Sequence, residues 1–436
     1  MAMHAVHKML ARASGKAEVN PGEVVTAKVD VVGINDVYPI VMDSFYDMNG
    51  ETVWDPEKVY LFLDHMAPAQ NLGAAKNQRV LRDFAAKTGC HLIDINRGIC
   101  HTLFPEWGKV KPGDVVIITD SHTCIHGAYG AFAAGVGATD VAAILIDGTL
   151  WLRIPEVVNV RLTGKLQEGV LAKDAALFIL GELGTDFGNY KVIEFSGPVV
   201  ESMCVAERTV LTVMATEMGA KATYIKPDAT TLAYVASKTA EPFIVDETDA
   251  AYVYAAEHTF DLSDLKPQVA VPHSVDNARD VEAVQGLQMD QIFVGSCTGG
   301  KFLDIEIVAK VLKGKEVHPS TRLVVTPATK EVFQECMAKG YIQDLVAAGA
   351  TITAPGCGAC SGLLGGVIAP FERCASTANR NFPGRMGGSL EAEVFLVSPL
   401  TAAATALTGK LEAGKLGADK LETGKLGAGK LEAANR

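Results

Sequence analysis

The sequence predicts an α/β protein built on largely parallel sheets, and three observations support this fold class. Short apolar runs typical of strands alternate along the chain with helix-like patterns. Polar residues suited to catalysis repeatedly follow the strand-like runs directly. The 436 residues, 48% of them hydrophobic, are enough for about two to four domains with large cores. Since ligands bind at the carboxyl ends of strands in open α/β sheets, we expect a cleft where several such ends meet.

The individual elements follow from local composition. Runs of β-branched and aliphatic residues predict strands at 59–63, 115–119, 291–294, 322–326 and 351–353. Stretches with helical spacing of apolar residues predict helices at 77–87, 139–150, 301–312 and 330–339. Breaks near Pro155 and Pro272 divide the chain into predicted domains at 1–155, 156–280 and 281–408.

The segment 409–436 differs in kind from the rest of the chain. Lys-Leu recurs there every five residues, with Gly, Ala and acidic residues between. A five-residue period forms neither a helical stripe nor a strand alternation. We therefore expect a flexible repeat tail.

Composition excludes several classes of protein. The net charge of −12 argues against a nucleic-acid surface, because phosphate contacts need clustered Lys and Arg. No apolar run reaches the roughly 20 residues that span a bilayer, and the N-terminus lacks the apolar region of a signal peptide. Nine cysteines in a long, core-rich chain do not resemble a disulfide framework. We expect a reducing, cytoplasmic compartment.

Three cysteines stand at strand ends in glycine-rich loops. Cys297 lies in Gly-Ser-Cys-Thr, and Cys357 and Cys360 form a C-x-x-C pair flanked by glycines. Structural zinc and closed iron–sulfur clusters normally take four protein ligands, so three thiolates leave a metal position open for a substrate. Zinc with a histidine, a redox dithiol or plain strand-end turns are alternatives. Ser-Gly after Cys360, in place of a helix, disfavours the dithiol.

Asp and His residues follow two of the predicted strands. Asp120 and His122 suit a carboxylate that orients an imidazole for acid–base work, although an Asp N-cap with a structural His fits as well. Asp64 and His65 are adjacent, so their pairing requires a turn. His101 has no partner at a diagnostic spacing.

A polar loop near the end of the chain suits anionic ligands. Asn379, Arg380 and Arg385 fit the recognition of carboxylates, which match the fork of a guanidinium; the alternative is a surface loop with ordinary salt bridges. Glu194 is a lone acid in a strand-like run, and by itself it predicts only an outward-facing strand residue.

Taken together, these motifs resemble the aconitase superfamily, and more narrowly its 3-isopropylmalate dehydratase and homoaconitase large subunits. The resemblance covers about residues 8–409, with matching stretches at 10–15, 120–123, 295–298, 356–360, 379–385 and 397–399. It implies three aconitase-type α/β domains around a central cleft that holds a [4Fe-4S] cluster. The cluster would be bound by Cys297, Cys357 and Cys360, and its fourth iron would act on the substrate as a Lewis acid.

The resemblance also implies an activity and roles for residues. The chain would be the large subunit of a hydro-lyase that dehydrates and isomerises a malate-type 2-hydroxy acid, with isopropylmalate as first choice and homocitrate, citrate or a dimethylmalate as rivals. The residues expected to handle the hydroxyl group and its proton are Asp64, His65, His101, Asp120 and His122, with Glu194 reaching the water or hydroxyl at the iron. Those expected to contact the substrate are Ser121, Asn379, Arg380 and Arg385.

Two further expectations come from differences from the family pattern. The swivelling domain of aconitase-type enzymes is absent after Pro399, so we expect a separate small subunit as partner. Relatives usually carry Asn after the Cys-Thr pair, whereas Gly299 stands here, which could loosen the cluster loop. The alternatives are a cluster-sensing, RNA-binding regulator and a scaffold that has lost activity.

Overall fold

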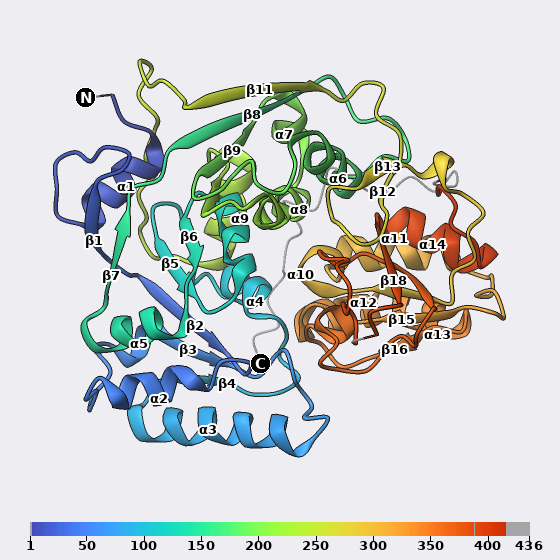
Figure 1. Ribbon diagram of the computed structural model, residues 1–436, viewed down its shortest axis with the longest axis horizontal. Coiled ribbons are helices and arrows are strands. Elements are labelled where there is room, and N and C mark those ends of the chain that lie inside the picture. The colour runs from blue at the N-terminus through green and yellow to red at the C-terminus, as the bar shows by residue number, and fades with distance from the viewer. Residues whose placement is uncertain (1, 388, 416–436) are drawn as a thin grey trace.

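The computed structural model describes residues 2–387 and 389–415, and sheets with parallel strands organise this part of the chain. The first sheet has the order β4-β3-β2-β5-β6 and is parallel throughout. Its strands are β2 (Val31–Asn35), β3 (Val59–Phe62), β4 (His91–Ile93), β5 (Val115–Ile118) and β6 (Phe132–Gly135). The helices of this region are α1 (Ala5–Ala13), α2 (Ile40–Asp47), η1 (Pro56–Lys58), α3 (Leu72–Thr88), α4 (Cys100–Glu106), η2 (Ser121–Tyr129) and α5 (Ala138–Asp147). Helices α2 and α3 lie along its outer side (Figure 1).

A second parallel sheet follows in the middle of the chain, with the order β10-β9-β8-β11. An antiparallel pair, β1 (Val24–Lys28) with β7 (Thr149–Arg153), precedes it. The strands of the second sheet are β8 (Val157–Thr163), β9 (Val192–Ser196), β10 (Ala222–Tyr224) and β11 (Ala256–Asp261). Its helical segments are α6 (Ala172–Leu183), α7 (Pro198–Ser202), α8 (Val205–Met214), η3 (Ala215–Met218) and α9 (Ala229–Lys238).

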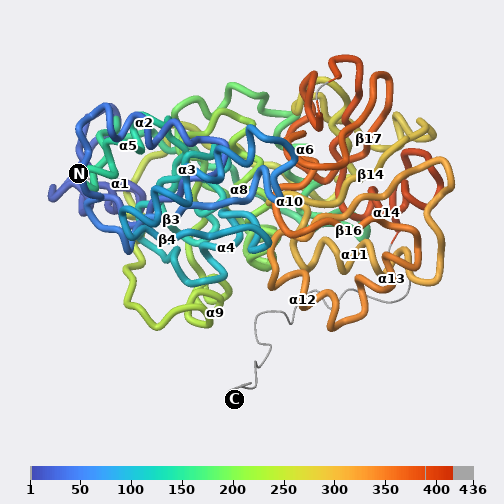
Figure 2. The backbone as a smooth tube through the Cα atoms, turned by 90° about the horizontal axis from the view of Figure 1, so that it is seen from below, coloured from blue at the N-terminus to red at the C-terminus, as the bar shows by residue number. Residues whose placement is uncertain are grey.

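The third sheet has the order β13-β12-β18-β17-β14-β15-β16. The strands β18, β17, β14, β15 and β16 are parallel to one another. Strand β12 pairs antiparallel with β18, and β13 pairs antiparallel with β12. Its strands are β12 (Gln268–Ala270), β13 (Ala278–Asp280), β14 (Gln291–Val294), β15 (Arg322–Val325), β16 (Thr351–Ile352), β17 (Arg373–Ser376) and β18 (Glu393–Val397). The helical segments are η4 (Val281–Ala283), α10 (Ser296–Gly299), α11 (Phe302–Leu312), α12 (Lys330–Ala338), α13 (Tyr341–Ala347), η5 (Gly358–Ser361) and α14 (Pro399–Thr408). This part lies at the opposite end of the molecule from the first sheet (Figure 2).

Burial explains why these strands form parallel sheets. Strands β3, β5 and β14 are buried at every position, as expected for strands covered on both faces. One hydrophobic cluster contains Phe104, Phe195 and Phe293 from the regions of the three sheets. The sheets therefore share a core, which fixes the strand ends of one region against those of another.

The predicted α/β class and the predicted strands are confirmed, with boundaries within one residue of those expected. The division into domains stays a prediction. Among the described residues, no helix is both long and apolar enough to cross a membrane.

The expected flexible tail is wrong at its start. Backbone bonds join Leu411 to Gly286 and Leu287, and the Leu411 side chain is fully buried. Lys410 forms an isolated bridge with Gln288. Lys410 and Leu411 are thus held against residues 286–288, although their composition predicted a tail. Residues 416–436 of the predicted tail lie outside the described part of the chain.

Candidate functional site

The candidate site lies where strand ends of the first and third sheets face each other. Strands β3 and β5 end at one side, and β14 and β17 end at the other. The two sides are bonded directly, since the backbone N–H of Cys357 donates to the carbonyl of Asp64 at 3.0 Å. A Cβ atom at Gly356 would approach the same oxygen at 3.0 Å, so glycine permits this close contact.

Asp120 is the centre of a group of histidines. It is the N-cap of η2, where it accepts from the backbone N–H of His122, as the helix-cap alternative predicted. Its Oδ1 also lies 2.9 Å from Nε2 of His101 and 3.3 Å from Nδ1 of His122, and its Oδ2 lies 3.1 Å from Nε2 of His65. The His101 contact is close but poorly aligned for a hydrogen bond. Asp120 therefore both caps η2 and contacts imidazole rings, so the two interpretations of this residue hold together.

The electrostatics of this group favour ionised partners. Burial by itself raises the pKa of Asp120, but the facing histidines, His101 foremost, outweigh burial and hold that pKa well below its usual range. Burial likewise opposes the charge of His65, yet Asp64 and Asp120 on either side raise its pKa well above the ordinary value. The result is a buried imidazolium between two carboxylates.

The turn after β3 is held by carboxylates as well. His65 Nδ1 lies 2.8 Å from Asp64 Oδ1, and the other oxygen of Asp64 accepts from the backbone N–H of Cys100 at the start of α4. Asp36, which follows β2, accepts from the backbone N–H groups of His65 and Met66 at 3.0 and 3.1 Å. The adjacent Asp–His pair thus forms through the turn that the sequence required.

Glu217, at the end of η3, joins the histidine group to the arginine loop. Its Oε1 lies 3.0 Å from His122 Nε2, and both of its oxygens accept from Arg380 Nε at 2.8 and 3.0 Å. Burial opposes its charge, but His122 and Arg380 together lower the pKa of Glu217. Arg380 also donates from Nη2 to the hydroxyl of Ser121 at 3.0 Å. Ser121 is exposed and Arg380 is partly exposed, so the site opens to solvent here.

The three predicted metal-ligating cysteines come together. Cys297, Cys357 and Cys360 are buried free thiols, and the sulfurs of the first two are close enough to Cys360 to shift their pKa values. Donors already face these sulfurs: Asn379 Nδ2 lies 3.3 Å from Cys297 Sγ, and Arg385 Nη2 lies 3.0 Å from Cys360 Sγ.

This donor set fits an iron–sulfur cluster with three cysteine ligands. The hydrogen bond from Cys357 is the main cause that lowers the pKa of Cys360 well below its usual range, and the charge of Arg385 lowers it further. The thiolate form, which binds metal, is therefore favoured at Cys360. Thr298 Oγ1 and Asn379 Oδ1 are buried without a hydrogen-bond partner beside Cys297. Side chains arranged for a larger group leave such polar atoms unpaired.

Local backbone geometry explains the loop that carries Cys297. Ser296 has a φ of 76°, a strained value for a residue other than glycine, and its hydroxyl accepts from the N–H of Thr298. The hydroxyl of Thr377 bonds the N–H and the carbonyl of Gly295 at 3.0 and 3.2 Å. A Cβ atom at Gly299 would overlap the side chain of Thr377. Glycine at this position therefore tightens the loop against Thr377, contrary to the expectation that it loosens it.

Glu194 does not reach this site, contrary to the sequence-based expectation. Its Oε2 lies 2.7 Å from Nε2 of His4 and accepts from the hydroxyl of Tyr254 at 2.8 Å. The central position of β9 in the second sheet directs it to this aromatic cluster near α1. Glu217 occupies the place beside His122 instead.

Two site residues were not predicted from sequence. Asp36 directly follows an apolar strand, as Asp64 and Asp120 do, so the same rule could have found it. Glu217 ends a helical stretch, and its contact with His122 joins positions 95 residues apart. No local spacing signals such a contact.

Similarity to known proteins extends over almost the whole chain. Residues 8–409 match the aconitase family (aconitate hydratase). The chain is 47% identical to 3-isopropylmalate dehydratase large subunit 1 of Methanopyrus kandleri, over 93% of this chain and 97% of the relative. It is 45% identical to a probable 3-isopropylmalate dehydratase large subunit of Methanothermobacter thermautotrophicus, over 94% and 98%. A probable methanogen homoaconitase large subunit of the same organism is 42% identical, over 94% and 97%.

Proposed function

This chain belongs to the aconitase family, and we propose that it is the large subunit of a hydro-lyase that acts on 3-isopropylmalate. Large subunits of 3-isopropylmalate dehydratase are similar to it over nearly their whole length. The observation that carries the proposal is the meeting of three buried cysteines with the Asp120 histidine group in one site. Asp120 influences the pKa of Cys297, and His122 that of Cys360, so the two sets lie within electrostatic reach.

Family membership implies an iron–sulfur cluster, and we assign the [4Fe-4S] type to it. Cys297, Cys357 and Cys360 would hold it. An iron without a cysteine ligand supplies Lewis-acid activation of a hydroxyl group.

The protein's own groups would bind the substrate and move its proton. We assign carboxylate binding to Arg380 and Ser121, because they lie at the solvent-facing edge and a guanidinium matches a carboxylate bidentately. His65 and His122, each held between two carboxylates, would carry protons at the imidazole nitrogens. Asp120 would keep these rings oriented while a hydroxyl group leaves and water returns.

A small-subunit partner follows from the phrase "large subunit" in the names of the relatives. We propose that this partner completes the site at the open edge near Ser121. Substrate choice would then depend on both chains.

The test is anaerobic reconstitution of this chain with iron and sulfide, followed by a dehydratase assay with and without a cognate small subunit. 3-Isopropylmalate, homocitrate, citrate and dimethylmalate are offered in turn, and the absorbance of an unsaturated acid is followed. We expect turnover of 3-isopropylmalate only with both chains, and about four irons and four sulfides per large subunit. The small subunit alone is the control.

Homoaconitase is the second candidate, since a relative of that name is nearly as similar. Preferred turnover of homocitrate would select it. A cluster-sensing RNA binder is disfavoured by the net charge of −12. A fully loaded cluster without turnover of any of the four acids would overturn the proposed function.

A further inference from the structure

A buried cation close to the site has no part in the roles assigned above. Lys173 is the second residue of α6, and its side chain is buried. Burial strips an ammonium of its hydration, and the first turn of a helix disfavours positive charge. Burial also lowers the pKa of Lys173 to about 7. A lysine in such a place needs specific partners to offset these costs.

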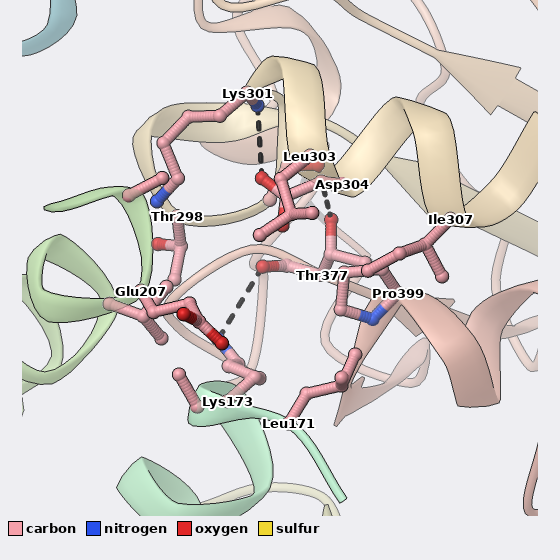
Figure 3. Close-up of a pocket in the computed structure, with 14 residues that line it drawn as sticks. Leu171, Lys173, Glu207, Thr298, Lys301, Leu303, Asp304, Ile307, Thr377 and Pro399 are labelled. Atoms are coloured by element: carbon pink, nitrogen blue, oxygen red, sulfur yellow. Dashed lines mark hydrogen bonds between the residues drawn. The ribbon is translucent and has the colours of Figure 1, made fainter. Parts of the chain in front are cut away.

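Its backbone partners lie in the region of the third sheet. Lys173 Nζ donates to the carbonyl of Ala378 at 2.6 Å and to that of Thr377 at 3.4 Å, and it lies 3.3 Å from the sulfur of Met214. The side chain borders a cavity of about 20 Å³, which Lys301 also lines (Figure 3). Helix α6 follows β8 of the second sheet, whereas Thr377 and Ala378 follow β17, so this bond ties two sheets together.

The two carbonyls directly precede the residues that contact the cysteines and the acids of the site. Asn379, the next residue, donates to Cys297 Sγ. Arg380 follows and binds Glu217 and Ser121. The position of these side chains therefore depends on how firmly the turn after β17 is held.

We propose that Lys173 is a positioning residue that fixes the turn after β17, so that Asn379 meets Cys297 and Arg380 meets the substrate carboxylate. The inference rests on the proposed function and deepens it. A loosened turn weakens carboxylate binding, so KM rises more than kcat falls. It also exposes the sulfur of Cys297 when the cluster is absent.

The test compares Lys173→Met, a substitution close in shape that removes the N–H donors, with Lys191→Met. Lys191 is a matched control, because its ammonium also donates to a backbone carbonyl, that of Phe187, away from the site. KM and kcat are measured per loaded cluster in the two-subunit enzyme. In cluster-free protein, the rate of Cys297 alkylation by iodoacetamide is measured by mass spectrometry, with buried Cys336 as internal reference.

We expect Lys173→Met to raise KM roughly tenfold, the loss typical of a hydrogen bond to a charged group, and to speed Cys297 alkylation several-fold. Lys191→Met should leave both within about twofold of wild type. A Lys173 variant in which either quantity stays within about twofold overturns the inference. Where Lys173→Met does not fold, Lys173→Leu, which also removes the N–H donors, is judged by the same criterion.

Failure of the proposed function gives a different result. In that case the wild-type enzyme turns over no hydroxy acid, and the alkylation rate alone decides the role of Lys173. Faster alkylation in the variant supports the positioning of Asn379 against Cys297, and an unchanged rate overturns it.

Discussion

Replacing Glu217 by glutamine tests whether Glu217, which the structure places beside His122, contributes to activity, and not Glu194, which was expected in the site from the sequence. The two glutamates are closely matched: each side chain is 9% exposed, and each bonds a histidine, at 3.0 Å for Glu217 and 2.7 Å for Glu194. Only Glu217 also bonds Arg380 and lies beside the histidines around Asp120. Glu194→Gln is therefore the control for Glu217→Gln.

The expected magnitude follows from the contacts that are lost. Glu217 takes part in charge-assisted hydrogen bonds with His122 and Arg380, each worth about 1.5–3 kcal/mol. An amide keeps one acceptor oxygen, so about half of this total, roughly 2 kcal/mol, should be lost. At about 1.4 kcal/mol per decade, kcat/KM falls on the order of 30-fold. Glu194→Gln should change kcat/KM less than about threefold.

The assay is the initial rate of dehydration with both subunits present, normalised to iron content. Thermal midpoints of both variants are measured alongside, because each substitution disturbs a buried ion pair. Equal losses of kcat/KM in the two variants, or a larger loss in Glu194→Gln, would refute the assignment of Glu217 to the site.

Three further predictions concern the cysteines, the glycines and pH. Cys297→Ala should lose iron on reconstitution, measured by iron and sulfide analysis, whereas Cys336→Ala, at a buried position on α12, should keep it. Gly299→Ala should lower the unfolding free energy by about 1–3 kcal/mol in urea titrations, because its Cβ overlaps the threonine after β17, whereas Gly365→Ala enters open space and should change it little. Burial raises the pKa of Glu106 from 4.5 to about 7, so the folded state binds this proton more tightly than the unfolded chain. The stability of the wild type relative to Glu106→Gln should therefore fall by roughly 3 kcal/mol as pH rises from about 4.5 to 7, and parallel stability curves for the two proteins would contradict this.

Much of the fold and part of the site could be predicted because both depend on local signals. Strands β3, β5 and β14 are fully buried, so they appear in the sequence as uninterrupted apolar runs. Asp64 and Asp120 follow β3 and β5 of one parallel sheet, whose carboxyl ends lie at one edge, so a local rule was enough to place these two residues near one another. Cys297 follows β14 of another sheet, and its place beside them depends on how the two sheets pack.

The errors arose where distant contacts decide the outcome. Glu194 occupies a strand, as predicted, but the pairing of β9 with its neighbours directs it toward His4. Glu217 lies beside His122 because α8, which precedes it, packs against η2, and no spacing of residues in the sequence predicts this packing. Leu411 is buried because residues 286–288 lie beside it, although its own surroundings in sequence are repetitive.

The division of the site between distant parts of the chain bears on how the protein matures. A ribosome releases Asp64 and Asp120 well before Cys297, and Cys357, Cys360 and Arg385 emerge later still. At about 5–20 residues per second, synthesis passes Asp120 many seconds before it reaches Cys297. On the proposed function, the acid–base residues are therefore made before the cysteines that would bind metal, and loading with iron and sulfide would come after synthesis.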